Sequence, residues 1–487
     1  MPFHSVAFLS FFALLTVLYY SIPHRVRWIL LLGGSCLFYG SWRPGYLPVL
    51  LGLTWVNYYV VLRMGRQEIK SRRQRYLLLC LTANLGCLFV FKYLNFIGQS
   101  LETLFGHPFL LFSVPTMDIL LPIGMSFYVF KNLSYAMEVY RGNQEPERHL
   151  GIYALYVSFF PQVTAGPIER STRLIPQFHD RVEFDEGRVT EGMRFILWGL
   201  FLKAVVADNL GSLVDPVYDQ PTLYGGLPLL VATFFFTFQI YCDFSGYSYI
   251  AIGAAEVMGF RTMDNFNYPY LSTSVAEFWR RWHISLSSWF RDYLYIPLGG
   301  NRVSASRRYF NILVVLLLCG LWHGANWTFV VWGGIHGLYL VAALVTRGLR
   351  DRIHEAIGLG RLPRVYKGLK VLTTFLLVCF AWIFFRANHL SDALYIVAHL
   401  FVGWGSAADQ GDIRSAPVSM NLRFEFAVAI ASILLLIGIA LLHRRGDVWQ
   451  RLAAKPLWIR WSVYYGLIVA FLLLGNFRSG QFIYFQF

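Results

Sequence analysis

Charged residues are scarce in this sequence. Asp, Glu, Lys and Arg make up 14% of the 487 residues, while 56% are hydrophobic, an apolar content above that of ordinary soluble domains. The segment from Tyr309 to Thr346 contains no charged residue of these four types and is long enough to enter a bilayer and return. This scarcity excludes a soluble globular enzyme and indicates an integral membrane protein.

Cysteine is also sparse, and it shows no pattern. The six cysteines are Cys36, Cys80, Cys87, Cys242, Cys319 and Cys379. They fall in apolar segments at spacings that fit neither zinc ligation nor a disulfide framework. We therefore expect them to be small core residues and expect no metal site. A G-x-S-x-G nucleophile elbow is missing, which argues against a hydrolase of that type. We also find no internal repeat, low-complexity tract or flexible linker.

Acidic residues are fewer than basic ones, 27 against 42, which gives a formal net charge of +15. The basic residues gather in alternate loops, such as Arg63–Arg75, Arg347–Lys370 and Arg444–Arg460, whereas the loops Gly98–Met117 and Ser212–Gly226 carry none. The positive-inside rule places the basic loops in the cytosol. Topology therefore explains most of the charge, and no nucleic-acid partner is needed.

Apolar runs predict an all-α polytopic protein with about ten full transmembrane helices, re-entrant hairpins and one interfacial helix. We expect the stretch Ile152–Ala165, which is short for a span, to re-enter or to lie in the interface. The loop Arg386–Arg423 is predicted outside. The spans are predicted near residues 3–22, 28–42, 46–62, 76–97, 119–139, 193–211, 227–258, 371–385, 426–442 and 461–476.

The domain prediction is a single integral membrane domain over residues 1–487. Residues 1–118 would form N-terminal spans, 119–346 a core that carries the motifs, and 347–487 the C-terminal spans.

His323 lies in the middle of the uncharged segment, in LWHGANWTF. If residues 309–323 are helical, a rise of ~1.5 Å per residue places His323 roughly 20 Å from the cytosolic surface. Irregular backbone at Gly324 and Asn326 is tolerated at that depth only against protein or a water-filled cavity, so His323 should line a cavity. A buried imidazole tends to stay neutral and can accept a proton, as a general base does. The alternative is a histidine that only joins helices, which we favour for His336.

The stretch Ser272–Arg302 predicts a helix that begins at a capping box, Ser274 with Glu277, and ends before Pro297. The spacing places apolar residues on one face and Arg280, His283, Ser287 and Arg291 on the other. This basic face fits contact with membrane lipid phosphates. It also fits a site for the phosphates of a cytosolic nucleotide-tailed donor, with His283 as a second polar group.

Other polar residues interrupt the apolar segments. Lys131 with Asn132, Lys203 with Asp208, and Asp243 in QIYCDFSGYS each indicate either a helix-packing contact or the wall of a polar cavity. We favour the packing contact for Lys203 and Asp208 and leave Asp243 open.

Two motifs, RRWHISLSSWFRDYLYIPLGGNR and GLWHGANWTFVVWGGIHG, together resemble the signature of the membrane-bound O-acyltransferase family. The segments PIGMSFYVF, AGPIER, QIYCDFSGYS and NFNYPY resemble its bacterial polysaccharide-acetylating branch, and LFYGSWRPGY extends the similarity toward the N-terminus. Branch members that act in alginate O-acetylation are the most similar. This chain departs from the branch at Tyr249, where Asp is common, and in KNLSYAMEVYRG.

The resemblance implies a fold of many helices around a central funnel, with His323 catalytic and His283 assisting. It implies a multi-pass protein of the bacterial inner membrane that moves an acetyl group from a cytosolic donor, acetyl-CoA, for O-acetylation of an exported polysaccharide such as alginate. The immediate acceptor is then the polymer or an extracytoplasmic partner acetyltransferase. Arg280 and Arg281 are candidates for donor phosphates, and Trp322 and Asn326 for donor binding and positioning. One alternative is a membrane transporter or proton-coupled carrier, since intramembrane His, Lys and Asp also mark transport paths. The others are acylation of another extracytoplasmic polymer and a scaffold that only recruits polymer-modifying enzymes.

Overall fold

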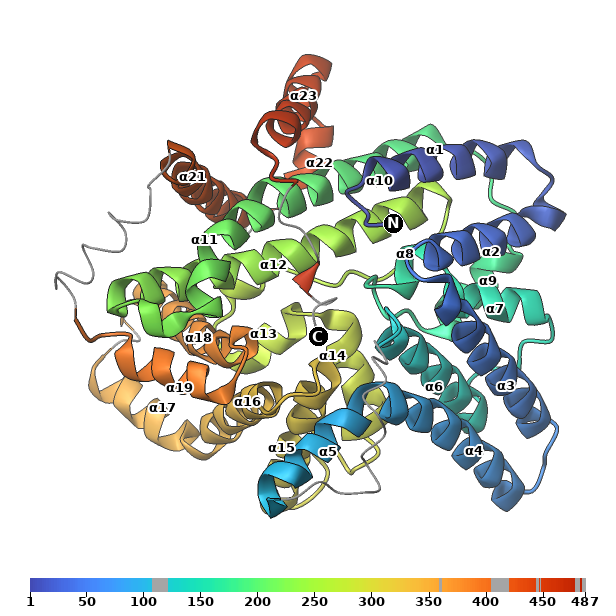
Figure 1. The fold of residues 1–487 in the computed structure, drawn as a ribbon, viewed down its shortest axis with the longest axis horizontal. Helices are drawn as coiled ribbons and strands as arrows, with labels where there is room; N and C mark the ends of the chain where they lie inside the picture. Colours follow the sequence, from blue (N-terminus) through green and yellow to red (C-terminus); the bar gives the residue numbers. More distant parts are fainter. Residues whose placement is uncertain are drawn as a thin grey trace. The chain divides into compact units, whose positions relative to one another are not determined.

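A computed structural model describes residues 1–106, 121–358, 361–403, 420–443, 446, 448–477, 482 and 483. Its described residues are helical with connecting turns (Figure 1), as the apolar pattern predicts. They divide into two compact units, 1–196 with 247–264 and 197–246 with 265–487. The predicted loops Gly98–Met117 and Arg386–Arg423 and the basic pair at 444–445 lie partly or wholly outside the described residues. The single domain with three consecutive regions stays a prediction.

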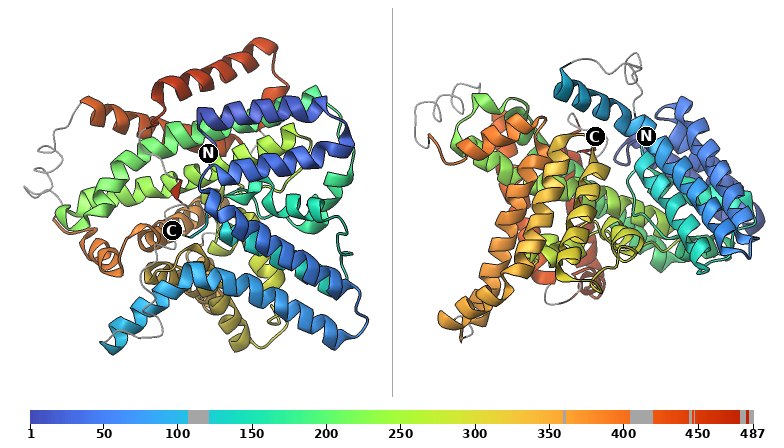
Figure 2. Two further views of the ribbon diagram at one scale, coloured as in Figure 1. Left: turned by 45° about the vertical axis from the view of Figure 1, so that its right-hand side comes forward. Right: turned by 90° about the horizontal axis from the view of Figure 1, so that it is seen from below.

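The first unit begins with apolar helices whose neighbours in sequence pack side by side. Figure 2 shows α3, α4 and α6 as one group of adjacent helices, and α3 also contacts α7. The helices are α1 (Val6–Ser21), α2 (His24–Gly40), α3 (Leu47–Gly65), α4 (Lys70–Leu88), α5 (Leu94–Phe105), α6 (Met125–Arg141), α7 (Leu150–Ser158), α8 (Phe160–Val163) and α9 (Ser171–His179), with η1 (Pro44–Tyr46) before α3 and η2 (Phe89–Tyr93) between α4 and α5.

A chain of buried side-chain hydrogen bonds joins α3, α4, α6 and α7. Asn84 donates to Asn57 at 3.0 Å, Asn57 to the hydroxyl of Tyr153 at 2.6 Å, and Tyr153 to Asn132 at 2.6 Å. Hydrogen bonds of this kind hold membrane helices together, because lipid is as apolar as the helix faces and the hydrophobic effect does not drive their association. For Asn132 the structure therefore shows the packing role that the sequence left open.

The buried Lys131 has a different environment from its neighbour Asn132. Its ammonium donates to the side chain of Gln162 at 2.9 Å and lies 4.5 Å from the ring centre of Tyr156. Gln162 belongs to α8, so Lys131 ties α6 to the stretch Ile152–Ala165. That stretch forms two short buried helices, α7 and α8, which agrees with the expectation that it is too short to span.

The second unit holds the remaining helices, and the unit boundaries fall inside α10 and α12. The helices that follow α9 are α10 (Glu186–Leu200), η3 (Phe201–Ala207), α11 (Asp208–Asp219), η4 (Pro221–Leu223), α12 (Gly226–Val257), η5 (Pro269–Leu271), α13 (Val275–Arg281), α14 (Ile284–Phe290), η6 (Arg291–Tyr295), α15 (Ala305–His323), α16 (Trp327–Val345), α17 (Arg347–Ala356), α18 (Pro363–Arg386), α19 (Leu390–His399), α21 (Met420–His443), α22 (Val448–Ala453) and α23 (Leu457–Leu474).

Nine helices among the described residues are long and apolar enough to cross a membrane, and α1 is a shorter apolar helix. They include α12, α18, α21 and α23, and one continuous span from Glu186 to Asp219 that contains α10, η3 and α11. The polytopic all-α prediction is therefore confirmed.

The uncharged segment forms a tight hairpin of α15 and α16. Each helix has 19 residues and is long and apolar enough for a full span, so the hairpin is longer than the re-entrant one expected from a start at residue 309. The two helices approach closely at Gly320 and Gly333: a Cβ on Gly320 would overlap the carbonyl of Phe329, and one on Gly333 the carbonyl of Leu316. Small residues allow such close helix contact in membranes.

The single helix predicted within Ser272–Arg302 is wrong. The N-terminal cap is present, with Ser274 accepting from the amide of Glu277, but the helix stops at Arg281 and α14 begins at Ile284. The chain breaks at His283, whose φ of 41° lies in the left-handed region, which is unusual for a residue other than glycine. The predicted face that joined His283 to Arg280 and Arg291 therefore does not form.

Candidate active site

His323 is the last residue of α15, and its ring lies inside the second unit. It is only 3% exposed. Its ring centre is 5.0 Å from that of Trp322, 5.0 Å from that of Trp332 and 5.3 Å from that of Phe385. These rings come from α15, α16 and α18, so His323 is enclosed by protein and does not face lipid. The cavity expected beside it stays a prediction.

His283 is brought next to this aromatic enclosure by the break between α13 and α14. The ring centres of His283 and His323 are 6.4 Å apart, and the indole of Trp322 contacts both, at 5.9 and 5.0 Å. The two histidines are 40 residues apart in the sequence. The structure therefore brings together the two residues that the motifs singled out.

Asn265 explains why the chain accepts the unusual backbone at His283. Nδ1 of His283 lies 3.0 Å from Oδ1 of Asn265, and the amide of Ile284 donates to the carbonyl oxygen of Asn265 at 2.9 Å. Oδ1 of Asn265 also accepts from the hydroxyl of Ser285 at 2.9 Å. These long-range bonds outweigh the local preference for a continuous helix. The motifs predicted no role for Asn265, although it stands in NFNYPY; its place in that motif was the available signal.

The bond to Asn265 fixes the tautomer of His283. An amide oxygen only accepts hydrogen bonds, so Nδ1 of His283 must carry a hydrogen. His283 is fully buried and lies outside the candidate spans; burial lowers its pKa well below the ordinary value. The ring is therefore neutral, and its lone pair resides on Nε2, the nitrogen that can accept a proton or a hydrogen bond.

His336 is separated from His323 by the ring of Trp332, which contacts both histidines. It is fully buried, with its ring parallel to that of Phe278 at 6.1 Å and 5.0 Å from that of Trp332. Neither ring nitrogen has a hydrogen-bond partner among the described residues. This apolar environment fits the packing role that we favour for His336.

Arg281 lines a polar pocket of about 450 Å³, whose other lining residues include Lys367, His443, Tyr268 and Glu277. Arg281 pairs with Glu277 at 2.8 Å and donates to the carbonyl of Asn267 at 3.3 Å. Burial raises the pKa of Glu277, but hydrogen bonds from Thr273 and the charge of Arg281 outweigh it and hold that pKa below its ordinary value. The rings of Tyr268 and His443 are 4.4 Å apart.

The remaining candidates lie in different places. Arg280 is exposed on α13 and is not among the residues that line this pocket. Trp322 is buried, and its ring contacts both histidines. Asn326 caps α16: its oxygen accepts from the amide of Thr328 at 3.1 Å, and its nitrogen donates to the carbonyl of Asn388 at 2.9 Å. The structure therefore gives Asn326 a role in the turn.

A buried ionic cluster forms where the sequence predicted only a pair. Nζ of Lys203 lies 2.7 Å from a carboxylate oxygen of Asp208 and 2.7 Å from one of Asp243. Asp243 also accepts from the amide of Ile483 at 2.8 Å. The cluster thus joins η3, α11 and α12 and attaches the C-terminal segment, which assigns Asp243 a structural contact.

Comparisons with known proteins agree with these motifs. A model of the membrane-bound O-acyltransferase (MBOAT) family matches residues 146–385, a range that contains both histidines. The chain is 42% identical over 407 residues to the probable alginate O-acetylase AlgI of Pseudomonas aeruginosa, which covers 82% of this chain and 75% of that protein.

More distant relatives bear other names. The chain is 34% identical over 396 residues to the peptidoglycan O-acetyltransferase of Helicobacter pylori, covering 76% of this chain and 72% of that protein. It is 31% identical over 295 residues to the teichoic acid D-alanyltransferase of Streptococcus thermophilus, covering 57% and 71%. With its motifs, its membrane-length helices and these relatives, the chain belongs to the membrane-bound O-acyltransferase family and is a multi-pass membrane acyltransferase.

Proposed function

We propose that this protein transfers an acetyl group from cytosolic acetyl-CoA across the bacterial inner membrane for O-acetylation of an exported polysaccharide of the alginate type. The observation that carries the proposal is the pair of buried histidines, His283 and His323, with ring centres 6.4 Å apart. The choice of polymer rests on the relatives, since identity is 42% to the probable alginate O-acetylase and 34% to the peptidoglycan O-acetyltransferase.

In the proposed reaction, His323 acts as the general base. It takes the proton of an acceptor hydroxyl, whose oxygen attacks the thioester carbonyl. The carbon–sulfur bond then breaks, and the departing thiolate receives the proton from His323 as the acetyl ester forms. General-base assistance typically contributes about 10² to 10⁴-fold, so positioning must supply much of the rest.

His283 assists as a hydrogen-bond acceptor. Its hydrogen resides on Nδ1, toward Asn265, so Nε2 can accept from a second hydroxyl of the acceptor while the attacking hydroxyl gives its proton to His323. The indole of Trp322, in contact with both rings, limits the directions from which substrate can approach.

The polar pocket beside Arg281 supports an anionic donor. Arg281 and Lys367 supply two cations against the one carboxylate of Glu277, and His443 with Tyr268 supplies a pair of adjacent rings. Guanidinium and ammonium groups bind phosphates, and aromatic rings stack on bases. Arg281 is only two residues before His283, so a donor whose phosphates bind here would be held in the same unit as the histidines.

Mass analysis of the exported polysaccharide tests the proposal. Cells that carry the chain should export polymer with acetyl esters derived from labelled acetyl-CoA, and a strain with His323→Gln should export polymer without them. His354→Gln, on α17, serves as the control. Label trapped on an extracytoplasmic acetyltransferase would identify that protein as the immediate acceptor. Uptake of a solute with no acyl transfer would support the carrier instead.

A further inference from the structure

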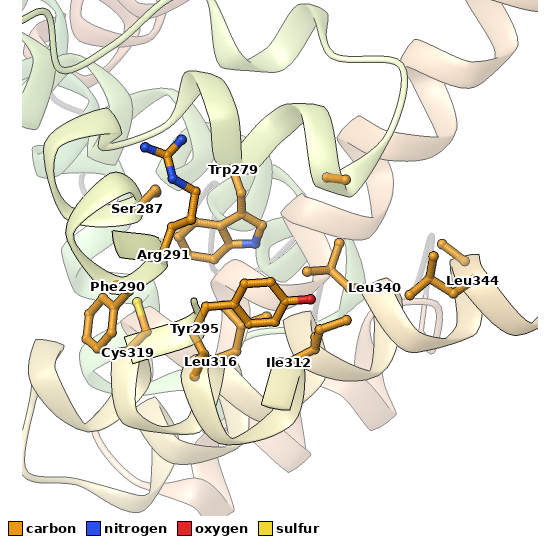
Figure 3. Close-up of a pocket in the computed structure, with 13 residues that line it drawn as sticks. Trp279, Ser287, Phe290, Arg291, Tyr295, Ile312, Leu316, Cys319, Leu340 and Leu344 are labelled. Carbon is orange, nitrogen blue, oxygen red and sulfur yellow. The ribbon is translucent and has the colours of Figure 1, made fainter. Parts of the chain in front are cut away.

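An apolar groove of about 310 Å³ lies in the second unit, apart from the histidine pair. Figure 3 shows its aliphatic side chains, Ile312, Leu316, Leu340 and Leu344, with Trp279 and Tyr295 beside them. The volume is at the lower end of the range for small-ligand pockets. The groove is lined by α13, α14, η6, α15 and α16.

The position of these elements places the groove at the membrane. α15 and α16 are both candidate spans, and Leu344, near the end of α16, is 37% exposed. The first turn of α15 and the last turn of α16 adjoin basic segments, which the positive-inside rule assigns to the cytosolic side. The groove thus lies at the boundary between hydrocarbon and cytosolic headgroups.

Cationic side chains lie at the polar edge of the groove. Arg291 belongs to its lining, and Figure 3 shows its guanidinium directed away from Ile312 and Leu316. Its Nε pairs with Asp292 at 2.7 Å, which neutralises one charge. Arg308 provides a second cation: it lies one helical turn before Ile312 on α15, so it shares the helix face that lines the groove.

The guanidinium carbon of Arg308 lies 5.5 Å from the ring centre of Tyr309. The Nε of Arg308 is buried and has no hydrogen-bond partner among the described residues. A buried donor of this kind is costly unless a partner satisfies it. A phosphate oxygen is a strong acceptor for a guanidinium.

We propose that this groove binds an anionic membrane phospholipid, with one acyl chain along Ile312, Leu316 and Leu340 and the phosphate held by Arg291 and Arg308. The apolar body and cationic edge match the two parts of such a lipid, and basic pockets between cytosolic helix ends bind anionic headgroups. This site is separate from the acetyl-transfer site proposed above.

Trp279 connects the groove wall to the histidine enclosure through ring contacts. This indole forms part of the groove wall and contacts the rings of His336 at 5.1 Å and Trp332 at 5.7 Å. Trp332 in turn contacts His323. A bound acyl chain would therefore pack against the side of Trp279 that faces away from the active site.

The test uses full-length protein purified in mild detergent. Phospholipid retained per protein is measured by mass spectrometry, and thermal unfolding is followed after adding phosphatidylglycerol, phosphatidylcholine or inorganic phosphate. We expect retained phosphatidylglycerol and a rise in the unfolding temperature with that lipid alone. Arg308→Gln should weaken its binding by about tenfold, the usual effect of losing one charge-assisted bond.

Two further variants make the result specific. Leu340→Trp should fill the groove and abolish retention. Arg307→Gln should retain lipid as the wild type does, because Arg307 is turned by about 100° from Arg308 around α15 and lies off the helix face that carries Ile312 and Leu316. Equal retention in the wild type, Arg308→Gln and Leu340→Trp would overturn the proposal. Equal stabilisation by phosphatidylcholine or inorganic phosphate would also overturn it.

Discussion

The ring of His283 is oriented by Asn265, whose Oδ1 lies 3.0 Å from Nδ1 of that histidine. This contact sets the tautomer. Together with the bond from the amide of Ile284 to the backbone carbonyl of Asn265, it holds the left-handed backbone at His283, whose ring lies 6.4 Å from that of His323. The chemistry we propose therefore depends on a side chain that does not itself touch the reacting atoms.

Replacing Asn265 tests that dependence. Asn265→Leu removes the acceptor for Nδ1 and should lower kcat for acetyl transfer by about 10 to 100-fold, as losses of orienting partners typically do, with KM for acetyl-CoA little changed. Asn265→Asp keeps an acceptor and adds a negative charge, so it should raise the pKa of His283 and move the acidic limb of the pH–rate profile to higher pH. Asn301→Leu, which removes the acceptor of the Tyr295 hydroxyl, is the control. If Asn301→Leu and the two Asn265 variants all changed kcat and KM to the same extent, the orienting role of Asn265 would be contradicted.

Stability should depend on pH through His283. Burial lowers its pKa in the folded state, while the unfolded chain takes up a proton near the ordinary value of about 6.5. Below that pH the unfolded state binds more protons, so the free energy of unfolding falls as the pH falls, by up to about 1.4 kcal/mol per pH unit, until the folded-state pKa is reached. Above it, His283 contributes no pH dependence.

The comparison of wild type with His283→Gln isolates this contribution. Thermal unfolding of the purified proteins is measured from about pH 7.5 to about pH 5, a range that includes the ordinary histidine pKa. The wild type should lose stability more steeply as the pH falls. Parallel curves would show that His283 is protonated in the folded protein or is not buried.

His336 should be replaceable, unlike His323. Its ring packs against Phe278 and Trp332, and its nitrogens have no hydrogen-bond partner in the described part of the chain. We expect His336→Phe to keep kcat within about tenfold of wild type, because a change of shape in a packed core typically costs stability of about 1–3 kcal/mol and removes no reacting group. A loss of activity as large as that of His323→Gln, in protein that is still folded, would assign chemistry to His336.

The ionic cluster around Lys203 should be needed for folding. Lys203→Met leaves Asp208 and Asp243 buried without the ammonium that contacts both, and breaking a buried pair in this way costs about 3–5 kcal/mol. We expect a low yield of monodisperse protein in fluorescence-detected size-exclusion chromatography. Adding Asp208→Asn and Asp243→Asn to Lys203→Met should recover part of that yield, and no recovery would mean that Lys203 stabilises the fold in another way.

Much of the helical architecture follows from local sequence. Apolar runs of membrane length predict α12, α18, α21 and α23, and the turn at Gly324 and Asn326 predicts the hairpin of α15 and α16. These features depend on hydrophobicity and on helix-breaking residues, which act over a few positions along the chain.

The details of the site depend on contacts between distant residues. The periodicity across Phe278, Trp282 and Leu286 favours one helix, yet the bonds from Asn265 break it at His283. Likewise, Lys203 meets Asp243 through tertiary packing, 40 residues along the chain. Local propensity contains no information about such partners, so only the motif resemblance brought the two histidines together before the structure did.

The most direct measurement is the transfer of labelled acetyl groups from acetyl-CoA by purified protein in proteoliposomes, with His323→Gln compared with wild type. General-base chemistry at His323 predicts turnover reduced by at least about 10²-fold, with unchanged thermal stability and unchanged binding of acetyl-CoA. Turnover equal to that of the wild type would contradict the central role of this histidine.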